Sequence, residues 1–170
     1  MRAAQRGSGE AVEELFARHW RPAYRAALLV TGDAAAAEDI TQEAFLAALR
    51  ALPRFDLRRP LRPWLHRIVV NRAIDWSRAR THRGEVSAET VGEEVAESGG
   101  GQGPGRGLGE DVMDALHRLG PEQRAVIVLR YVLELTPGEI GDLLELPRGT
   151  VNSRLRRGLD ELARLLEDER

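Results

Sequence analysis

Apolar residues recur at steps of three and four along the first part of the chain. The first stripe consists of Val12, Leu15, Phe16, Trp20, Tyr24 and Leu28. This spacing places all six on one face of an amphipathic helix. The run Thr31-Gly32-Asp33 follows, and it predicts the end of that helix and a cap for the next, because glycine favours helix ends and aspartate favours helix starts.

The next helix is predicted to have one apolar and one polar face. Its inward face consists of Ala37, Ile40, Ala44 and Ala48, and its outward face of Glu38, Asp39, Gln42 and Glu43. Leu52-Pro53 ends the helix, because proline removes a backbone donor. The polar residues therefore form one outward patch, and the plain alternative is a solvated face whose acids favour the helix dipole.

A third helix is predicted from about Pro63 to Arg80. One side carries Leu61, Leu65, Val69 and Trp76, and roughly the other carries Arg67, Asn71, Ile74 and Arg78. Such a row of arginine and asparagine could lie along a nucleic-acid strand. The pattern is imperfect, because Arg72 and Asp75 point towards the apolar side. Trp64 and Trp76 could stack on unpaired bases or belong to the core.

The last third of the chain predicts two short helices joined by a tight turn. Leu119-Gly120-Pro121 separates two earlier helical segments. Thr136, Pro137 and Glu139 then have the spacing of a capping box with proline at the first helical position. Ile140 and Leu144 face inward before the turn, and Val151 and Leu155 face inward after it. This arrangement is typical of a helix-turn-helix.

The second helix of this pair presents a cationic outer face. Thr150, Ser153, Arg154 and Arg157 point outward, with Arg148 and Asn152 on the flank. Arginine can pair with guanine and asparagine with adenine in a major groove, so the pattern predicts DNA binding. The alternative is an ordinary helical hairpin with a charged surface. Glu145 occupies the turn, where glycine is common and a positive φ would cost another residue about 1 kcal/mol.

Charge is distributed unevenly although the formal net charge is −2. Residues 53–83 carry nine arginines and two acids, whereas residues 84–111 carry seven acids and one arginine. Residues 147–158 add four arginines and no acid. Two basic patches on either side of an acidic segment suggest a polyanionic partner, although a solvated arginine-rich surface would show the same composition.

The acidic segment also predicts a domain boundary. Residues 84–109 contain nine glycines and one proline, a composition that cannot bury enough apolar surface to order itself. The expected organisation is all-α, with two small helical domains at residues 8–83 and 110–168 joined by a flexible acidic linker at 84–109.

Composition excludes several classes of function. The chain of 170 residues has no cysteine, and its four histidines are scattered without metal-ligand spacing, so we expect no catalytic residue, no metal and no cofactor. No glycine motif that would cradle a phosphate precedes a helix. No apolar run approaches the roughly 20 residues of a membrane span, and the start lacks a signal-peptide pattern. We therefore expect a cytoplasmic, non-enzymatic protein without membrane insertion.

Three stretches resemble the extracytoplasmic function (ECF) type of bacterial RNA polymerase sigma factor, in the sigma-70 family. They are "AEDITQEAFLAAL" from Ala37, "PWLHRIVVNRAID" from Pro63 and "LGPEQRAVIVLRYVLELTPGEIGDLLELPRGTVNSRLRRGL" from Leu119. The resemblance implies that the N-terminal domain is sigma region 2 and the C-terminal domain is region 4. It also implies transcription initiation with core RNA polymerase on promoter DNA.

The same resemblance assigns roles to residues. Asp39, Gln42 and Glu43 would dock on the clamp helices of the largest polymerase subunit. Region 2 would capture the −10 element as a single strand, with contacts from Arg67, Asn71, Arg78 and Arg80. The −35 contacts would be Arg148, Thr150, Asn152, Ser153, Arg154 and Arg157. ECF-type factors are commonly held by an anti-sigma factor, so one is an expected partner.

A different class of function remains open from the residues themselves. A helix-turn-helix repressor or activator would bind duplex DNA without polymerase and recognise a two-fold operator. A sigma factor would bind free DNA weakly and open promoters only with polymerase.

Overall fold

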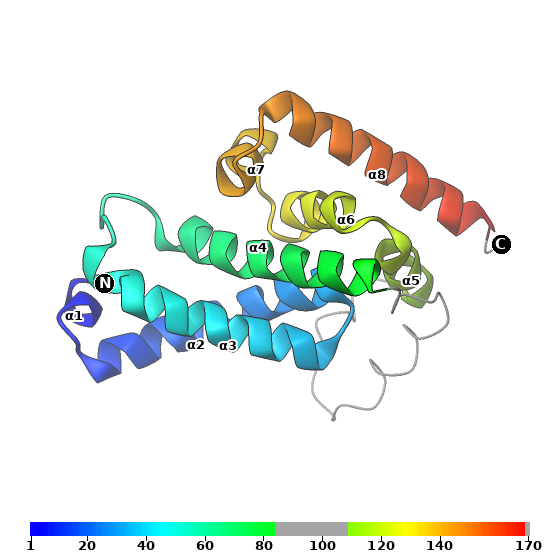
Figure 1. Ribbon diagram of the computed structural model, residues 1–170. Coiled ribbons are helices and arrows are strands. Elements are labelled where there is room, and N and C mark those ends of the chain that lie inside the picture. The colour runs from blue at the N-terminus through cyan, green and yellow to red at the C-terminus, as the bar shows by residue number, and fades with distance from the viewer. Residues whose placement is uncertain (84–108, 169–170) are drawn as a thin grey trace.

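The computed structural model describes residues 1–83 and 109–168, and every regular element in these ranges is a helix (Figure 1). The all-α prediction is therefore confirmed. The predicted linker at 84–109 lies, except for Gly109, outside the described residues. Within the described part, no helix is both long enough and apolar enough to span a bilayer.

Residues 1–83, called the N-terminal half below, contain four α-helices. They are α1 (Arg2–Gln5), α2 (Gly9–Thr31), α3 (Ala34–Ala51) and α4 (Leu61–His82). Helices α2, α3 and α4 pack against one another in pairs. The four residues predicted to face inward on α3 are all buried, as are Leu65 and Val69 of α4. The apolar periodicity therefore predicted the inward face of α3 and part of that of α4, whereas of the six residues in the predicted α2 stripe only Leu28 is buried and the other five are half-buried.

The connection between α2 and α3 has the predicted capping. Gly32 ends α2 with a φ of 70°, in the left-handed region that glycine tolerates. The Asp33 carboxylate then accepts a hydrogen bond from the amide of Ala36 at 2.8 Å and caps α3. This turn lies where the N-terminal half contacts the C-terminal half, as described below.

The loop from α3 to α4 is held from the N-terminus. A short 3₁₀ turn, Leu52–Arg54, follows α3. The Gln5 amide donates to the carbonyls of Leu52 and Phe55 at 3.0 and 2.8 Å. The rings of Phe55 and Trp64 lie 4.6 Å apart, so the loop packs back on the start of α4.

Residues 109–168, called the C-terminal half below, also contain four α-helices. They are α5 (Glu110–Arg118), α6 (Pro121–Ile127), α7 (Pro137–Leu144) and α8 (Arg148–Asp168), with a π-helical segment, Val128–Val132, after α6. Helix α8 packs against α5, α6 and α7. Ile140 and Val151 are fully buried and Leu155 is 8% exposed, so α7 and α8 pack as the helix-turn-helix pattern predicts.

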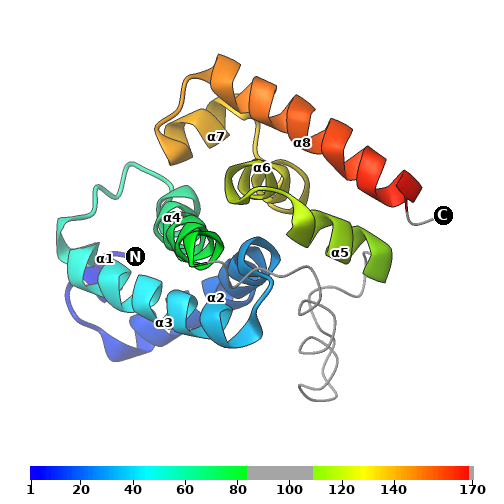
Figure 2. The ribbon, with the colours of Figure 1, turned by 45° about the vertical axis from the view of Figure 1, so that its right-hand side comes forward.

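The two halves pack directly on each other, which the sequence did not reveal. Helix α4 lies between α2 and α3 on one side and α6 and α7 on the other (Figure 2). Helix α2 also contacts α5 and α6. Buried apolar residues of both halves form one continuous cluster.

Candidate nucleic-acid and protein interfaces

The helix-turn-helix begins with a complete capping box. The Thr136 hydroxyl accepts from the Glu139 amide at 3.3 Å, and the Glu139 carboxylate accepts from the Thr136 amide at 2.8 Å. Pro137 occupies the first helical position. The hydrogen bonds from Thr136, first from its amide and then from its hydroxyl, lower the pKa of Glu139. The sequence prediction of this helix start is confirmed.

The turn between α7 and α8 is tight. Glu145 has a φ of 57°, as its place in the turn predicts, and the Leu146 amide donates to the Gly141 carbonyl at 2.9 Å. A Cβ on Gly141 would lie 2.7 Å from the Leu146 carbonyl oxygen, closer than a side-chain Cβ normally approaches a non-bonded oxygen. Glycine at position 141 therefore lets the turn fold against α7 and sets where α8 starts.

The residues predicted to contact the −35 element all lie on the first half of α8. Arg148, Asn152 and Arg157 are exposed, whereas Thr150, Ser153 and Arg154 are half-buried. Ser153 donates to the Thr150 carbonyl at 2.9 Å, and Arg157 donates to the Ser153 carbonyl at 3.3 Å. The six side chains supply guanidinium, amide and hydroxyl groups of the kinds that read base edges and hold phosphates.

Arg154 is half-buried, and its charge interacts with an acid of a neighbouring helix. Its charge lies close enough to Glu122 of α6 to contribute to that carboxylate's pKa. Burial acts to raise the pKa of Glu122, but hydrogen bonds from its own backbone and from Arg78 outweigh it and lower the pKa. Glu122 is therefore an anion between cationic residues of both halves.

The predicted docking residues on α3 form an exposed polar patch. Asp39, Gln42 and Glu43 are all exposed on the side of α3 that faces away from its core contacts. Gln42 donates to Glu38 at 3.2 Å, and Glu43 pairs with Arg72 of α4 at 2.8 Å. In both views α3 lies on the side of α4 opposite to α6, α7 and α8 (Figures 1 and 2).

The predicted −10 residues on α4 do not form an open surface. Arg67 pairs with Glu145, and Arg78 pairs with Glu122 at 2.8 Å. Arg80 pairs with Asp33 at 3.2 Å, and Asn71 is half-buried. Ile74, which the periodicity placed on the same row, is only 6% exposed. Its outward placement was wrong because that side of α4 packs against the C-terminal half.

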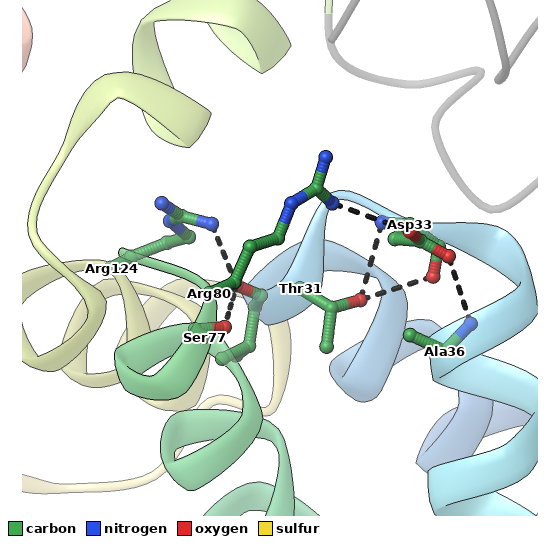
Figure 3. Close-up of polar contacts among 7 residues, drawn as sticks. Thr31, Asp33, Ala36, Ser77, Arg80 and Arg124 are labelled. Carbon is green, nitrogen blue, oxygen red and sulfur yellow. Dashed lines mark hydrogen bonds and ion pairs between the residues drawn. The ribbon is translucent and has the colours of Figure 1, made fainter. Parts of the chain in front are cut away.

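Sequence reasoning also missed a buried arginine at the contact between the halves. Arg124 of α6 is 7% exposed, and it donates to the carbonyls of Val30, His117 and Leu119 at 2.7, 2.6 and 2.9 Å. Figure 3 shows Arg124 reaching the end of α2, where Ser77 donates to the same Val30 carbonyl at 3.2 Å. The sequence contained one indication that Arg124 is buried, because the apolar run from Ala125 to Leu129 follows it directly.

Burial shifts the ionisation of three basic groups. It lowers the pKa of His66 and of His117 to about 4 each, with smaller contributions from Arg62 and Arg124 respectively. Burial likewise lowers the pKa of Arg124 to about 10, and Arg124 stays charged near neutral pH. His66 and His117 are therefore neutral core residues. Within residues 1–83 and 109–168, no cluster of three or more histidine, aspartate or glutamate residues could hold a metal ion.

Family models match both halves of the chain. The model for sigma-70 region 2 matches residues 15–83, and the model for sigma-70 region 4 matches residues 109–162. The chain belongs to the sigma-70 family, as an ECF RNA polymerase sigma factor. The predicted family and its two helical parts are thus confirmed, and the helix-turn-helix on α7 and α8 lies within region 4.

Curated relatives support the same family over nearly the full chain. The ECF RNA polymerase sigma factor SigW of Bacillus subtilis is 31% identical and aligns over 99% of this sigma factor and 95% of its own length. The RNA polymerase sigma factor CarQ of Myxococcus xanthus is 32% identical over 94% of this chain and 91% of its own.

A solved structure has the same arrangement of helices. CnrH, solved in complex with the cytosolic domain of CnrY, matches with a TM-score of 0.72 and 29% identity, over 98% of this chain and 94% of that chain. Region 2 and region 4 of this sigma factor therefore share the fold of CnrH.

Proposed function

We propose that this ECF sigma factor binds core RNA polymerase and reads a promoter with two separate surfaces. The observation that carries the proposal is the cationic face of α8. It follows a complete capping box and a tight turn, and it lies in a chain that matches both sigma regions. Arg148, Thr150, Asn152, Ser153, Arg154 and Arg157 would contact the −35 element in the major groove.

Region 2 supplies the other surfaces. Arg67, Asn71, Arg78 and Arg80 would contact the unpaired −10 strand, where stacking and phosphate contacts offset the few kcal/mol that unpairing a base costs. Asp39, Gln42 and Glu43 would dock on the clamp helices of the largest polymerase subunit. We place the domain boundaries at 8–83 and 110–168, with the segment 84–109 connecting them through polymerase.

The protein acts as a specificity subunit in the cytoplasm, without chemistry or a cofactor of its own. We expect that an anti-sigma factor controls it. CnrH was solved in complex with the cytosolic domain of CnrY, which supports a protein partner for this fold.

The test is run-off transcription with purified bacterial core polymerase on a pool of genomic promoters from the source organism. New start sites that require both proteins, with a shared upstream sequence, are the expected result. Protection of a two-fold duplex site by the protein alone, without new start sites, would instead support a repressor or activator.

A further inference from the structure

The loop from α3 to α4, residues 53–60, is basic and exposed (Figure 1). It contains three exposed arginines, Arg54, Arg58 and Arg59, and one acid, Asp56. The Asp56 carboxylate accepts from the amide and the guanidinium of Arg58, both at 3.0 Å, which gives the loop a local turn. The loop leads directly into the helix whose arginines we assign to the −10 strand.

The side-chain amide of Gln5 holds the beginning of this loop. It donates to the Leu52 carbonyl at 3.0 Å and to the Phe55 carbonyl at 2.8 Å. An amide NH₂ group has one hydrogen for each carbonyl, whereas the amide oxygen would repel both. The Phe55 ring also packs on Trp64, at 4.6 Å between ring centres. These contacts set the direction in which the rest of the loop leaves α3.

Helix α1, which carries Gln5, is itself fixed to the bundle. Ala4 is only 5% exposed, and the Ser8 amide donates to the Ala3 carbonyl at 3.0 Å. The Ser8 side chain then caps the start of α2. All of these residues precede the part of the chain that the region 2 model matches, residues 15–83. A segment outside the matched part of region 2 therefore positions the loop.

We propose that Gln5 is a positioning residue for capture of the −10 strand: it holds residues 53–60 where their arginines extend the cationic row of α4. The inference rests on the proposed function. The arginines of the loop supply phosphate contacts, which fix the register of a strand without reading its sequence. Binding orders a mobile loop at a cost in entropy, so a loop that Gln5 holds in advance binds the strand more tightly.

The position of the loop is tested without polymerase. Gln5→Met removes both donors and keeps a side chain of similar length and the same charge. Trypsin should cut the native variant after Arg54 and after Arg58 about 2- to 13-fold faster than the wild type, the factor that corresponds to one net hydrogen bond. Equal rates of cleavage at these two sites, followed by mass spectrometry, would overturn the proposal.

A double-mutant cycle tests whether Gln5 acts through the arginines of the loop. The assay is retention of a labelled promoter duplex by the protein assembled with core polymerase. Gln5→Met should lower the affinity about 2- to 13-fold in the otherwise wild-type protein. In a protein that carries Arg54→Gln/Arg58→Gln/Arg59→Gln, the same substitution should lower it less than about 2-fold. A merely structural role predicts the same loss in both backgrounds, and that result would overturn the proposal.

Gln5→Glu gives a second test with a matched control. Its ionised carboxylate would lie against the carbonyl oxygens of Leu52 and Phe55, to which it cannot donate. Arg6→Gln removes the same unit of charge from an exposed neighbour and leaves Gln5 in place. Promoter affinity of Gln5→Glu should be about 2- to 13-fold below that of Arg6→Gln, and equal affinities would overturn the proposal. If the wild-type protein retains no promoter with core polymerase, the proposed function fails, while trypsin still reports whether Gln5 holds the loop.

Discussion

At the scale of single residues, Arg154 tests whether α8 reads bases. Arg154→Ala should weaken binding to the preferred promoter by about 1–3 kcal/mol and relax preference at one −35 position, because a bidentate contact to a base is lost. The measurement is run-off transcription across promoters that vary at each −35 position. Arg164→Ala is the control, since Arg164 lies near the end of α8 and pairs with Glu161 and Asp168. An equal loss on every promoter would identify Arg154 as a phosphate contact.

Two glutamates with positive φ offer a matched test of backbone strain. Glu134 and Glu145 have φ values of 58° and 57°, where glycine avoids a cost of about 1 kcal/mol. Glu134→Gly should therefore raise the free energy of unfolding by about 0.5–1 kcal/mol in urea denaturation. Glu145→Gly should raise the free energy of unfolding by a smaller amount, because this substitution also removes the ion pair with Arg67. Equal gains would mean that this pair adds nothing to stability.

At the scale of elements, Gly141 controls the packing of the α7–α8 turn. Gly141→Ala would drive a Cβ into the Leu146 carbonyl, a backbone atom that can move only if the turn shifts. We expect a loss of about 1–3 kcal/mol in the free energy of unfolding, as for other overpacked sites. The control is Gly149→Ala, whose Cβ would meet nothing within 4 Å and which should be neutral or stabilising. A neutral Gly141→Ala would show that the turn tolerates a shift.

The outer face of α3 tests polymerase docking as a property of one helix. Asp39→Ala/Gln42→Ala should reduce association with core polymerase about tenfold or more if these side chains lie at the centre of the contact. Both residues are exposed, so the free energy of unfolding should change little. The control is Glu10→Ala/Glu13→Ala, which alters two exposed residues at the start of α2. Unchanged association in a pull-down with core polymerase would place the docking surface elsewhere.

At the scale of the whole molecule, local patterns predicted the helices and caps but not how the halves meet. Apolar spacing predicts the buried face of α3, and the Thr136–Glu139 spacing predicts the capping box, because both depend on residues within one or two turns. The contact of Arg124 with Val30 joins residues 94 positions apart. The periodicity of residues along one helix cannot predict a contact between such distant residues. Ile74 was placed on the wrong side of α4 for the same reason, because it is buried by packing between the halves.

The two buried imidazoles make the stability of the whole molecule depend on pH. His66 and His117 have a pKa of about 4 in the folded protein, against about 6.5 in an unfolded chain. Between these values the unfolded chain binds protons that the folded chain does not, so the free energy of unfolding should fall as the pH drops from about 7 to about 4. The loss should reach at most about 3.5 kcal/mol per histidine, at about 1.4 kcal/mol per unit of pKa.

Urea denaturation at a series of pH values measures this slope and separates its sources. His66→Phe tests the interior of the N-terminal half, and His117→Phe tests the contact between the halves, where the ring packs against Gly32. Each variant should flatten the slope between pH 7 and 4, because it removes a group that is protonated only on unfolding. His82→Phe, at an exposed position, should leave the slope unchanged. A slope that neither core variant alters would mean that these imidazoles stay accessible to protons in the folded protein.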